Sequence, residues 1–116
     1  MQKGTEEELK LKQDKLQAEL QLEVASIEHS TLTEEEKTEA MLAIWTKYYQ
    51  DLDELRQTAQ DDQIEKLKLY DENEVNELLL KDDRTYEEQM SVLELQAEEA
   101  DKALELLEER RQRQHE

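Results

Sequence analysis

The sequence lacks cysteine, proline and phenylalanine, and its only glycine is Gly4. With no cysteine and only two histidines, the chain has few of the side chains that bind transition metals or act as nucleophiles. A single glycine cannot form a glycine-rich phosphate-binding loop. The missing proline and near-missing glycine remove the residues that usually end helices and form turns. We therefore expect long helices, no enzymatic activity and no cofactor.

Targeting and membrane-spanning segments are also missing. The first residues, MQKGTEEELK, are polar and acidic, unlike a secretory signal. No stretch approaches the roughly 18 apolar residues of a transmembrane helix. The absence of cysteine fits a reducing compartment. We expect a cytoplasmic or virion-associated protein with no membrane partner.

Metal-binding motifs fail at particular positions. Paired Glu-x-x-His motifs build di-iron sites in helical bundles, but Ser26 and Gln112 stand where His29 and His115 would need the glutamate. A calcium-binding loop starting at Asp61 would need glycine at position 66, which is Lys66. No metal site is expected.

The composition indicates helices. Charged residues make up 41% of the chain and hydrophobic residues 35%, which is too little apolar material for a thick core. Disorder would fit these values. However, Glu, Leu, Lys, Gln, Ala and Arg dominate, and all favour helix. Helices with narrow apolar stripes need few hydrophobic residues, so we predict an all-α, coiled-coil type of fold.

Three capping boxes predict where helices begin. Each has a threonine followed three residues later by a glutamate, at Thr5, Thr33 and Thr85. Before the second box, the residues from His29 to Leu32 include small hydroxyl side chains that favour a turn. A connection this short usually joins antiparallel helices, which predicts a helical hairpin with a turn at 30–33.

We therefore expect one helical module over 1–116, with helices at about 6–29, 34–80 and 85–114. Candidate breaks lie near 60–63 and 81–85. The absence of a glycine C-cap at either place favours continuous helices. A weaker capping signal at Thr58 leaves an antiparallel four-helix bundle as the alternative.

Apolar residues at helical spacing predict the packing faces. The first helix carries two adjoining stripes, which suits a helix with more than one neighbour; one is Leu9, Leu16, Leu20, Val24 and Ile27, and the other is Leu11, Ala18, Leu22 and Ala25. Two later stripes follow alternating spacings of four and three. The predicted packing residues are Met41, Trp45, Tyr48, Leu52 and Leu55 in one stripe, and Tyr86, Met90, Leu93, Ala97, Ala100, Leu104 and Leu107 in the other.

The two later stripes differ in phase, so either a stammer or a helix break lies between them. We expect them to pack against each other or against copies of the chain, since unpaired stripes would expose large apolar side chains. Trp45 and its neighbours Tyr48 and Tyr49 hold three of the five aromatic residues and are the expected core cluster.

The charge pattern limits the partners. The net charge of −18 makes direct nucleic-acid binding unexpected and permits a basic protein surface as a partner. The sign reverses at Arg110, Arg111 and Arg113, after the acidic stretch 71–109. Cations there favour the dipole at a helix C-terminus, and a basic docking tip is the alternative.

The stretch 15–56, KLQAELQLEVASIEHSTLTEEEKTEAMLAIWTKYYQDLDELR, combines a Leu/Glu helix, a break of small residues, a capped start and an aromatic-rich helix. It resembles helical segments of bacteriophage tail tape-measure proteins and similar long phage coiled-coil proteins. The resemblance lies in composition and rhythm, covers about a third of the chain and assigns no functional residue.

The leading functional prediction is a non-enzymatic spacer or scaffold that acts through helix–helix contacts with protein partners or with itself. A small acidic protein that mimics DNA and inhibits a nucleic-acid-binding enzyme is the alternative, suggested by the acidic stretch. An assembly chaperone or capsid scaffolding protein is a third, suggested by the helical rod and its basic end.

Overall fold

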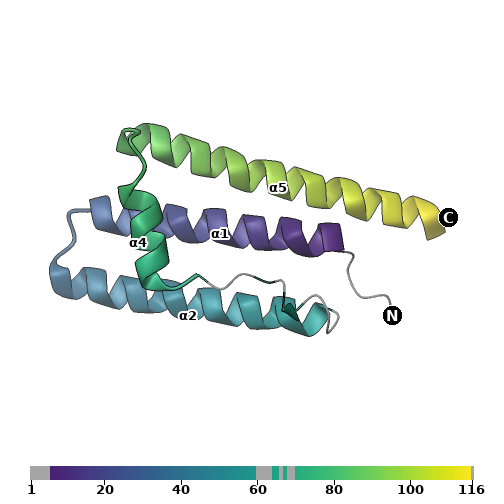
Figure 1. Cartoon of the computed structure of the whole chain (residues 1–116), viewed down its shortest axis with the longest axis horizontal. Coiled ribbons are helices and arrows are strands. Elements are labelled where there is room, and N and C mark those ends of the chain that lie inside the picture. Colours follow the sequence, from purple (N-terminus) through teal and green to yellow (C-terminus); the bar gives the residue numbers. More distant parts are fainter. Residues whose placement is uncertain (1–5, 60–63, 66, 68–69, 116) are drawn as a thin grey trace.

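Figure 1 shows the computed structural model, which describes residues 6–59, 64–65, 67 and 70–115. The helices in these ranges are α1 (Glu6–His29), α2 (Glu34–Thr58), α4 (Glu72–Leu80) and α5 (Tyr86–His115). The described residues contain no strand, so the prediction of an all-α fold is confirmed. No helix in these ranges has the length and apolar character needed to cross a bilayer.

The three long helices form an elongated layer with α1 in the middle. α2 and α5 pack on opposite sides of α1, and each runs antiparallel to it, so α2 and α5 point in the same direction (Figure 1). The short α4 crosses α1 at the end of the layer where α5 begins. The molecule measures 53 × 27 × 22 Å along its principal axes.

The turn between α1 and α2 is closed by the predicted capping box. Thr33 Oγ1 accepts a hydrogen bond from the Glu36 backbone N–H at 3.2 Å, and the Glu36 carboxylate accepts one from the Thr33 N–H at 3.2 Å. At the end of α1, Ser30 Oγ donates to the Ile27 carbonyl at 2.6 Å and Lys37 Nζ donates to the Glu28 carbonyl at 3.3 Å. These bonds satisfy backbone groups that a helix end leaves unpaired.

The expected continuous helix over 34–80 is wrong, because α2 ends at Thr58. Ala59 is the C-cap with an extended backbone (φ −88°, ψ 153°), and the Thr58 hydroxyl donates to the Leu55 carbonyl at 2.9 Å. Thr58 is therefore the last residue of a helix and not the start of one. The capping signal at Thr5 and the candidate break at 60–63 lie outside the described residues.

Helix α4 begins and ends without glycine. Asp71 caps its start, with its carboxylate accepting from the Glu74 N–H at 2.8 Å. Its C-cap, Lys81, keeps a right-handed helical backbone. No described residue has a positive φ. The prediction of continuity failed because helices here end in extended or right-handed residues, for which a glycine is not needed.

The change of direction after α2 buries apolar side chains that a straight helix would leave exposed. Val75 of α4 is fully buried, and Leu67 is buried in the same cluster as residues of α1 and α2. The buried members of this core cluster are Leu9, Leu20, Val24, Trp45, Tyr48, Leu52, Leu55, Ala59, Leu67 and Val75. We call Leu67 together with α4 the returning segment. Burial of its apolar side chains on α1 and α2 is the main force that favours its position.

The expected aromatic cluster is present at the centre of α2. The rings of Trp45 and Tyr48 meet edge to face, with centroids 5.6 Å apart and planes at 87°, a favourable arrangement for aromatic pairs. Tyr48 Oη also accepts a hydrogen bond from the Tyr70 backbone N–H at 3.4 Å. Tyr48 thus joins α2 to the segment that leads into α4.

The two stripes of α1 serve two neighbours, as the sequence predicts. Leu9, Leu20 and Val24 belong to the cluster shared with α2 and the returning segment. Ala18 and Ala25 are buried outside that cluster, as are Leu93 and Ala100 of α5, the helix on the other side of α1. Among the buried residues that the structure describes, large side chains therefore dominate the interface with α2, and three of the four outside that cluster are alanines.

Candidate helix–helix interaction surfaces

The predicted packing residues lie mainly inside the chain. Trp45, Tyr48, Leu52 and Leu55 are buried, and Met41 packs against their cluster while partly exposed. In the second stripe Leu93 and Ala100 are buried, and the others are partly buried: Tyr86, Met90, Ala97, Leu104 and Leu107. The stripes of α2 and α5 both pack on α1, which separates them. Pairing of the two stripes with each other is therefore not what the structure contains.

Two ion pairs link α1 to α5. Lys15 Nζ lies 2.7 Å from Asp101 Oδ1, and the hydrogen bond to Asp101 raises the pKa of Lys15 despite an opposing effect of burial. Nearer the start of α1, Arg111 pairs with Glu8. Glu8 also pairs with Lys12 one turn along α1, at 3.3 Å. These pairs join α5 to α1 at two places along the helices.

Glu8 stays charged in spite of its partial burial. Burial alone would raise its pKa, but hydrogen bonds from Arg111 and Lys12 outweigh that effect, and the pKa of Glu8 lies below its usual value. Its side chain is only 13% exposed. Loss of the carboxylate charge would therefore leave two cations without their shared anion.

The predicted basic tip is divided between an internal and an external role. Arg111 forms an ion pair with Glu8 of the same chain, whereas Arg110 and Arg113 are exposed. Of the three arginines, Arg110 and Arg113 are therefore the two that remain open to an external contact. The sequence did not distinguish them, because Glu8 and Arg111 are more than a hundred residues apart.

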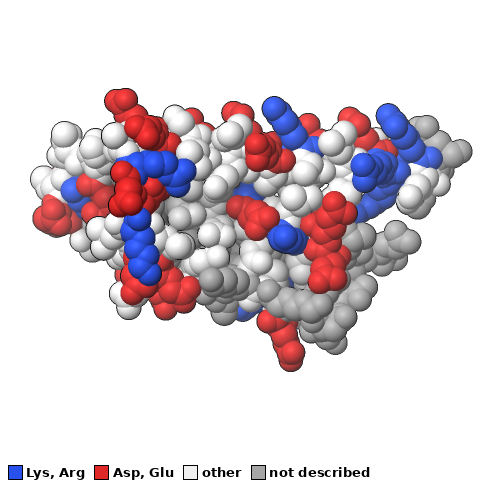
Figure 2. Space-filling view, turned by 45° about the horizontal axis from the view of Figure 1, so that its top comes forward, with Lys and Arg blue, Asp and Glu red and all other residues white. Residues whose placement is uncertain are grey.

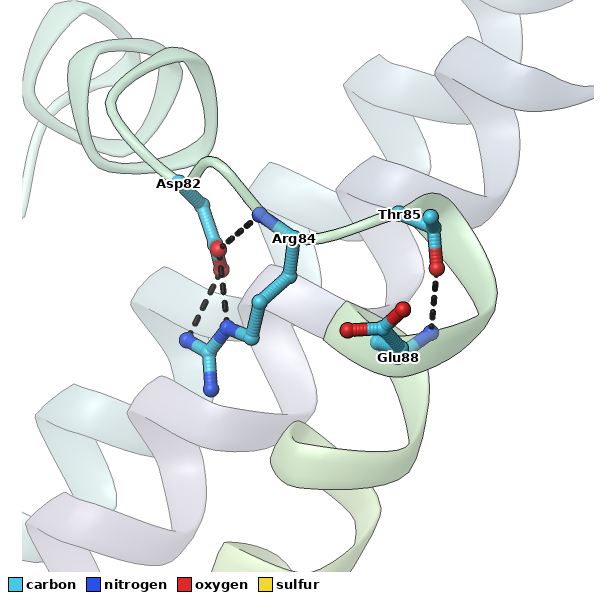
Figure 3. A network of polar contacts seen from close by, with 4 residues as sticks. All are labelled: Asp82, Arg84, Thr85 and Glu88. Atoms are coloured by element: carbon cyan, nitrogen blue, oxygen red, sulfur yellow. Dashed lines mark hydrogen bonds and ion pairs between the residues drawn. The ribbon is translucent and has the colours of Figure 1, made fainter.

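The turn between α4 and α5 is built from side-chain hydrogen bonds (Figure 3). The Asp82 carboxylate accepts from the Arg84 backbone N–H at 3.0 Å and from Arg84 Nε and Nη2, each at 2.8 Å. Hydrogen bonds from Arg84 lower the pKa of Asp82. Thr85 Oγ1 then accepts from the Glu88 N–H at 3.2 Å and caps α5. The turn thus forms without glycine or proline.

An open hollow of about 520 Å³ lies beside this turn, between the end of α1, α4 and the start of α5. On its wall, the rings of His29 and Tyr86 stack with centroids 3.8 Å apart and planes at 11°. The sequence placed both residues at helix ends but gave no sign of this contact. No group of three potential ligand side chains among the described residues is arranged to hold a metal ion.

Several large apolar side chains point outward from the two outer helices. On α5, Leu95 is 54% exposed and Leu106 is 56% exposed. On α2, Leu42 is 69% exposed and Tyr49 is 51% exposed. Sequence reasoning missed Leu42, Leu95 and Leu106 because it followed a single stripe on each of these helices. The prediction that Tyr49 belongs to the core is wrong, because its side chain lies on the outer side of α2 beside the buried Trp45 and Tyr48.

Acidic and basic side chains are intermixed on the face shown in Figure 2. The ion pairs Lys15–Asp101 and Arg84–Asp82 also neutralise charge locally. The exposed apolar side chains of α2 and α5 interrupt this charged surface. No protein-family model, curated protein or solved structure matches this chain.

Proposed function

We propose that this chain is a non-enzymatic structural or assembly module, a spacer or scaffold that acts through helix–helix contacts with protein partners or copies of itself. The observation that carries this proposal is the exposure of large apolar side chains on the outer helices, after α1 has taken up the inner stripes. Paired exposed apolar residues at helical spacing favour docking of another helix. The resemblance of 15–56 to phage tail proteins suggests a phage structural assembly as its setting.

Site-specific photo-crosslinking tests this function. A photoreactive phenylalanine analogue is placed at Leu42 or Leu106, and at the exposed polar position Gln50 of α2 as a matched control. In cells that express the chain from its own gene, Leu42 and Leu106 should give discrete protein adducts, and Gln50 should give few. An absence of adducts, to a copy of the chain or to another protein, from both apolar positions would contradict an assembly role.

DNA mimicry remains the second candidate, and the start of α5 favours it. From Tyr86 to Asp101 this helix has six acidic residues and no basic one, and five of the six are exposed, leaving Asp101 partly buried. The Lys15–Asp101 pair and the intermixed charges in Figure 2 weaken a phosphate-like row. Binding to a basic nucleic-acid enzyme should then fall steeply between about 50 and 200 mM salt, and salt-insensitive binding would exclude mimicry.

The scaffolding alternative depends on the exposed arginines at the end of α5. Arg110→Gln with Arg113→Gln should abolish docking to an acidic partner while leaving the fold intact, because both side chains are exposed. Deletion of the whole tip is a poorer experiment, since it removes Arg111 and its pair with Glu8. Unchanged partner binding in the double variant would remove this candidate.

A further inference from the structure

Helix α5 carries a second stripe on the side facing away from α1. Its members are Glu88, Leu95, Glu99, Lys102, Leu106 and Arg113, separated by seven, four, three, four and seven residues. These spacings keep side chains on one face of a helix. All six are exposed. The stripe that packs on α1 includes Leu93 and Ala100, which are buried.

No other part of the described chain covers this outer stripe. Of the described helices, α1 is the one against which α5 packs extensively, and Figure 1 shows α5 at the edge of the layer. A helix that lay alongside the outer stripe would meet Leu95 and Leu106, three turns apart. The stripe is therefore a long, accessible surface whose partner must match its pattern of charges.

We propose that the partner is a second copy of this chain, bound antiparallel through the outer stripe of α5. This inference rests on the proposed function and names its partner. When the helix is reversed about the point midway between Ala100 and Asp101, Leu95 faces Leu106 of the second copy. By the same operation Glu99 faces Lys102 of the second copy. A two-fold axis repeats each pairing.

The match extends to the ends of the stripe. Glu88 faces Arg113 of the second copy, which adds another oppositely charged pair at each end. Val92 faces Glu109 of the second copy, and this pairing is the one that adds no attraction. Of the four pairings in the reversed register, one is apolar with apolar and two are acid with base, so the surface is complementary to itself.

The distribution of charge along α5 selects the antiparallel direction. The half from Tyr86 to Asp101 has six acidic and no basic residues, whereas 102–115 has four basic and three acidic residues. Parallel pairing would place the acidic halves side by side, with like charges opposed at Glu88 and Glu99. Antiparallel pairing places each acidic half beside a basic end.

The dimer should be weak. Two leucines per copy bury well below the roughly 1,000 Å² typical of a stable interface, and each chain carries a net charge of −18. We expect a dissociation constant of about 10–500 µM, which makes the dimer visible at high concentration and absent at low concentration.

Charge exchange at the centre of the stripe tests the proposal. With Glu99→Lys alone, the new lysine faces Lys102 of the second copy, so two positive charges oppose each other. With Lys102→Glu alone, the new glutamate faces Glu99 of the second copy, so two negative charges oppose each other. By sedimentation velocity from about 10 µM to 1 mM, each single variant should dimerise at least about tenfold more weakly. The double variant E99K/K102E should recover dimerisation. An equimolar mixture of the two single variants should form a heterodimer.

Engineered thiols test the direction, because the chain has no native cysteine. In the antiparallel register, position 95 of one copy lies about 16 Å along the helix axis from position 95 of the other copy. Position 95 of one copy lies beside position 106 of the other. A thiol crosslinker of about 8 Å should join Leu95→Cys to Leu106→Cys in a mixture. Neither variant should crosslink to itself. Helicity and the thermal midpoint of every variant provide the folding control.

Three results would overturn the proposal. They are a wild-type chain that stays monomeric up to 1 mM, single charge variants that dimerise like the wild type, and self-crosslinking of Leu95→Cys. These results leave the assembly function intact if Leu42 still gives adducts with a different protein. An absence of adducts at both Leu42 and Leu106 would contradict the proposed assembly function. Failure of the dimer proposal and failure of the proposed function therefore give different results.

Discussion

Glu8 connects the first turn of α1 to the last turns of α5 through a single carboxylate. It accepts hydrogen bonds from Arg111 and Lys12, and its pKa lies below the usual value. Glu8→Gln should lower the free energy of unfolding at pH 7 by about 0.5–1 kcal/mol, because both cations remain partly exposed to solvent. Urea titration followed by circular dichroism measures the change.

The same pair predicts a dependence on pH. A carboxylate whose pKa is lower in the folded state stabilises the fold above its unfolded pKa of about 4.3, and this stability is lost as the pH falls through the folded pKa. The difference between wild type and Glu8→Gln should therefore shrink as the pH is lowered from 5 to 2. Glu7→Gln, at an exposed neighbouring position, is the control. A difference that is constant over this range would show that the charge of Glu8 is not responsible.

Tyr48 combines an aromatic contact with a hydrogen bond, and burial raises the pKa of its hydroxyl. Tyr48→Phe keeps the ring beside Trp45 but leaves the Tyr70 N–H without that acceptor. We expect a loss of about 0.5–1.5 kcal/mol in unfolding free energy. Trp45 is the only tryptophan, so its fluorescence reports the transition. Tyr49→Phe, on the exposed side of α2, should change stability little, and an equal loss in both variants would contradict the assigned role.

At the scale of one element, the capping box at Thr33 fixes the start of α2. Thr33→Ala removes the hydroxyl that accepts from the Glu36 N–H and should cost about 1 kcal/mol of unfolding free energy. Thr31→Ala, in the same turn and also exposed, is the matched control. Denaturant titrations of the two variants should separate, and coincident curves would show that the box contributes nothing measurable.

The break inside the predicted helix 34–80 was harder to predict than the other helix boundaries, since the predicted ends at 29, 80 and 114 lie at or next to observed helix ends. The boxes at Thr33 and Thr85 are local patterns of a few residues, and hydrogen bonds to both hydroxyls are present. The end of α2 at Thr58 has no such pattern, because Ala59 simply adopts an extended backbone. What favours that end is distant: the returning segment buries Leu67 and Val75 on α1 and α2. Burial between segments far apart in the sequence is not visible in local residue spacing.

The packing faces followed from residue spacing, but their partners did not. The stripes of α2 and α5 were identified by alternating intervals of four and three residues, and most of their members are buried or partly buried. Spacing alone cannot say which stripe meets which. The two stripes of α1 carry that information, since a helix with two apolar faces separates two neighbours, but the sequence prediction paired the later stripes with each other or with copies of the chain. The exposed Leu95 and Leu106 were missed because charged residues lie between them.

At the scale of the molecule, the three helices make a body that lies between a compact bundle and an extended rod. The Cα radius of gyration is 16.1 Å, compared with about 13 Å for a compact domain of this length. The difference arises because α2 and α5 sit on opposite sides of α1 and do not close into a bundle. Each outer helix thereby keeps a face toward solvent.

The small residues between α1 and α5 set how closely those helices approach. Ala100→Leu would place a larger side chain where Ala18 and Ala100 are both buried. We expect a loss of about 1–3 kcal/mol in unfolding free energy from overpacking. Ala43→Leu, at an exposed position of α2, is the control and should be close to neutral. Urea titration measures the unfolding free energy of both variants. An unchanged value for Ala100→Leu would mean that the α1–α5 interface accommodates the larger side chain without strain.

The Glu8–Arg111 pair has a mechanical consequence. Because α1 begins and α5 ends at the same end of the layer, a pulling force applied to these two ends acts across the α1–α5 interface and not along it (Figure 1). Under tension the helices would peel apart one turn at a time, starting at Glu8 and Arg111 and then at Lys15 and Asp101. Such a geometry resists load poorly in that direction. A spacer built from this body would therefore transmit force better through the outer faces of its helices, where the proposed second copy binds, than through the start of α1 and the end of α5.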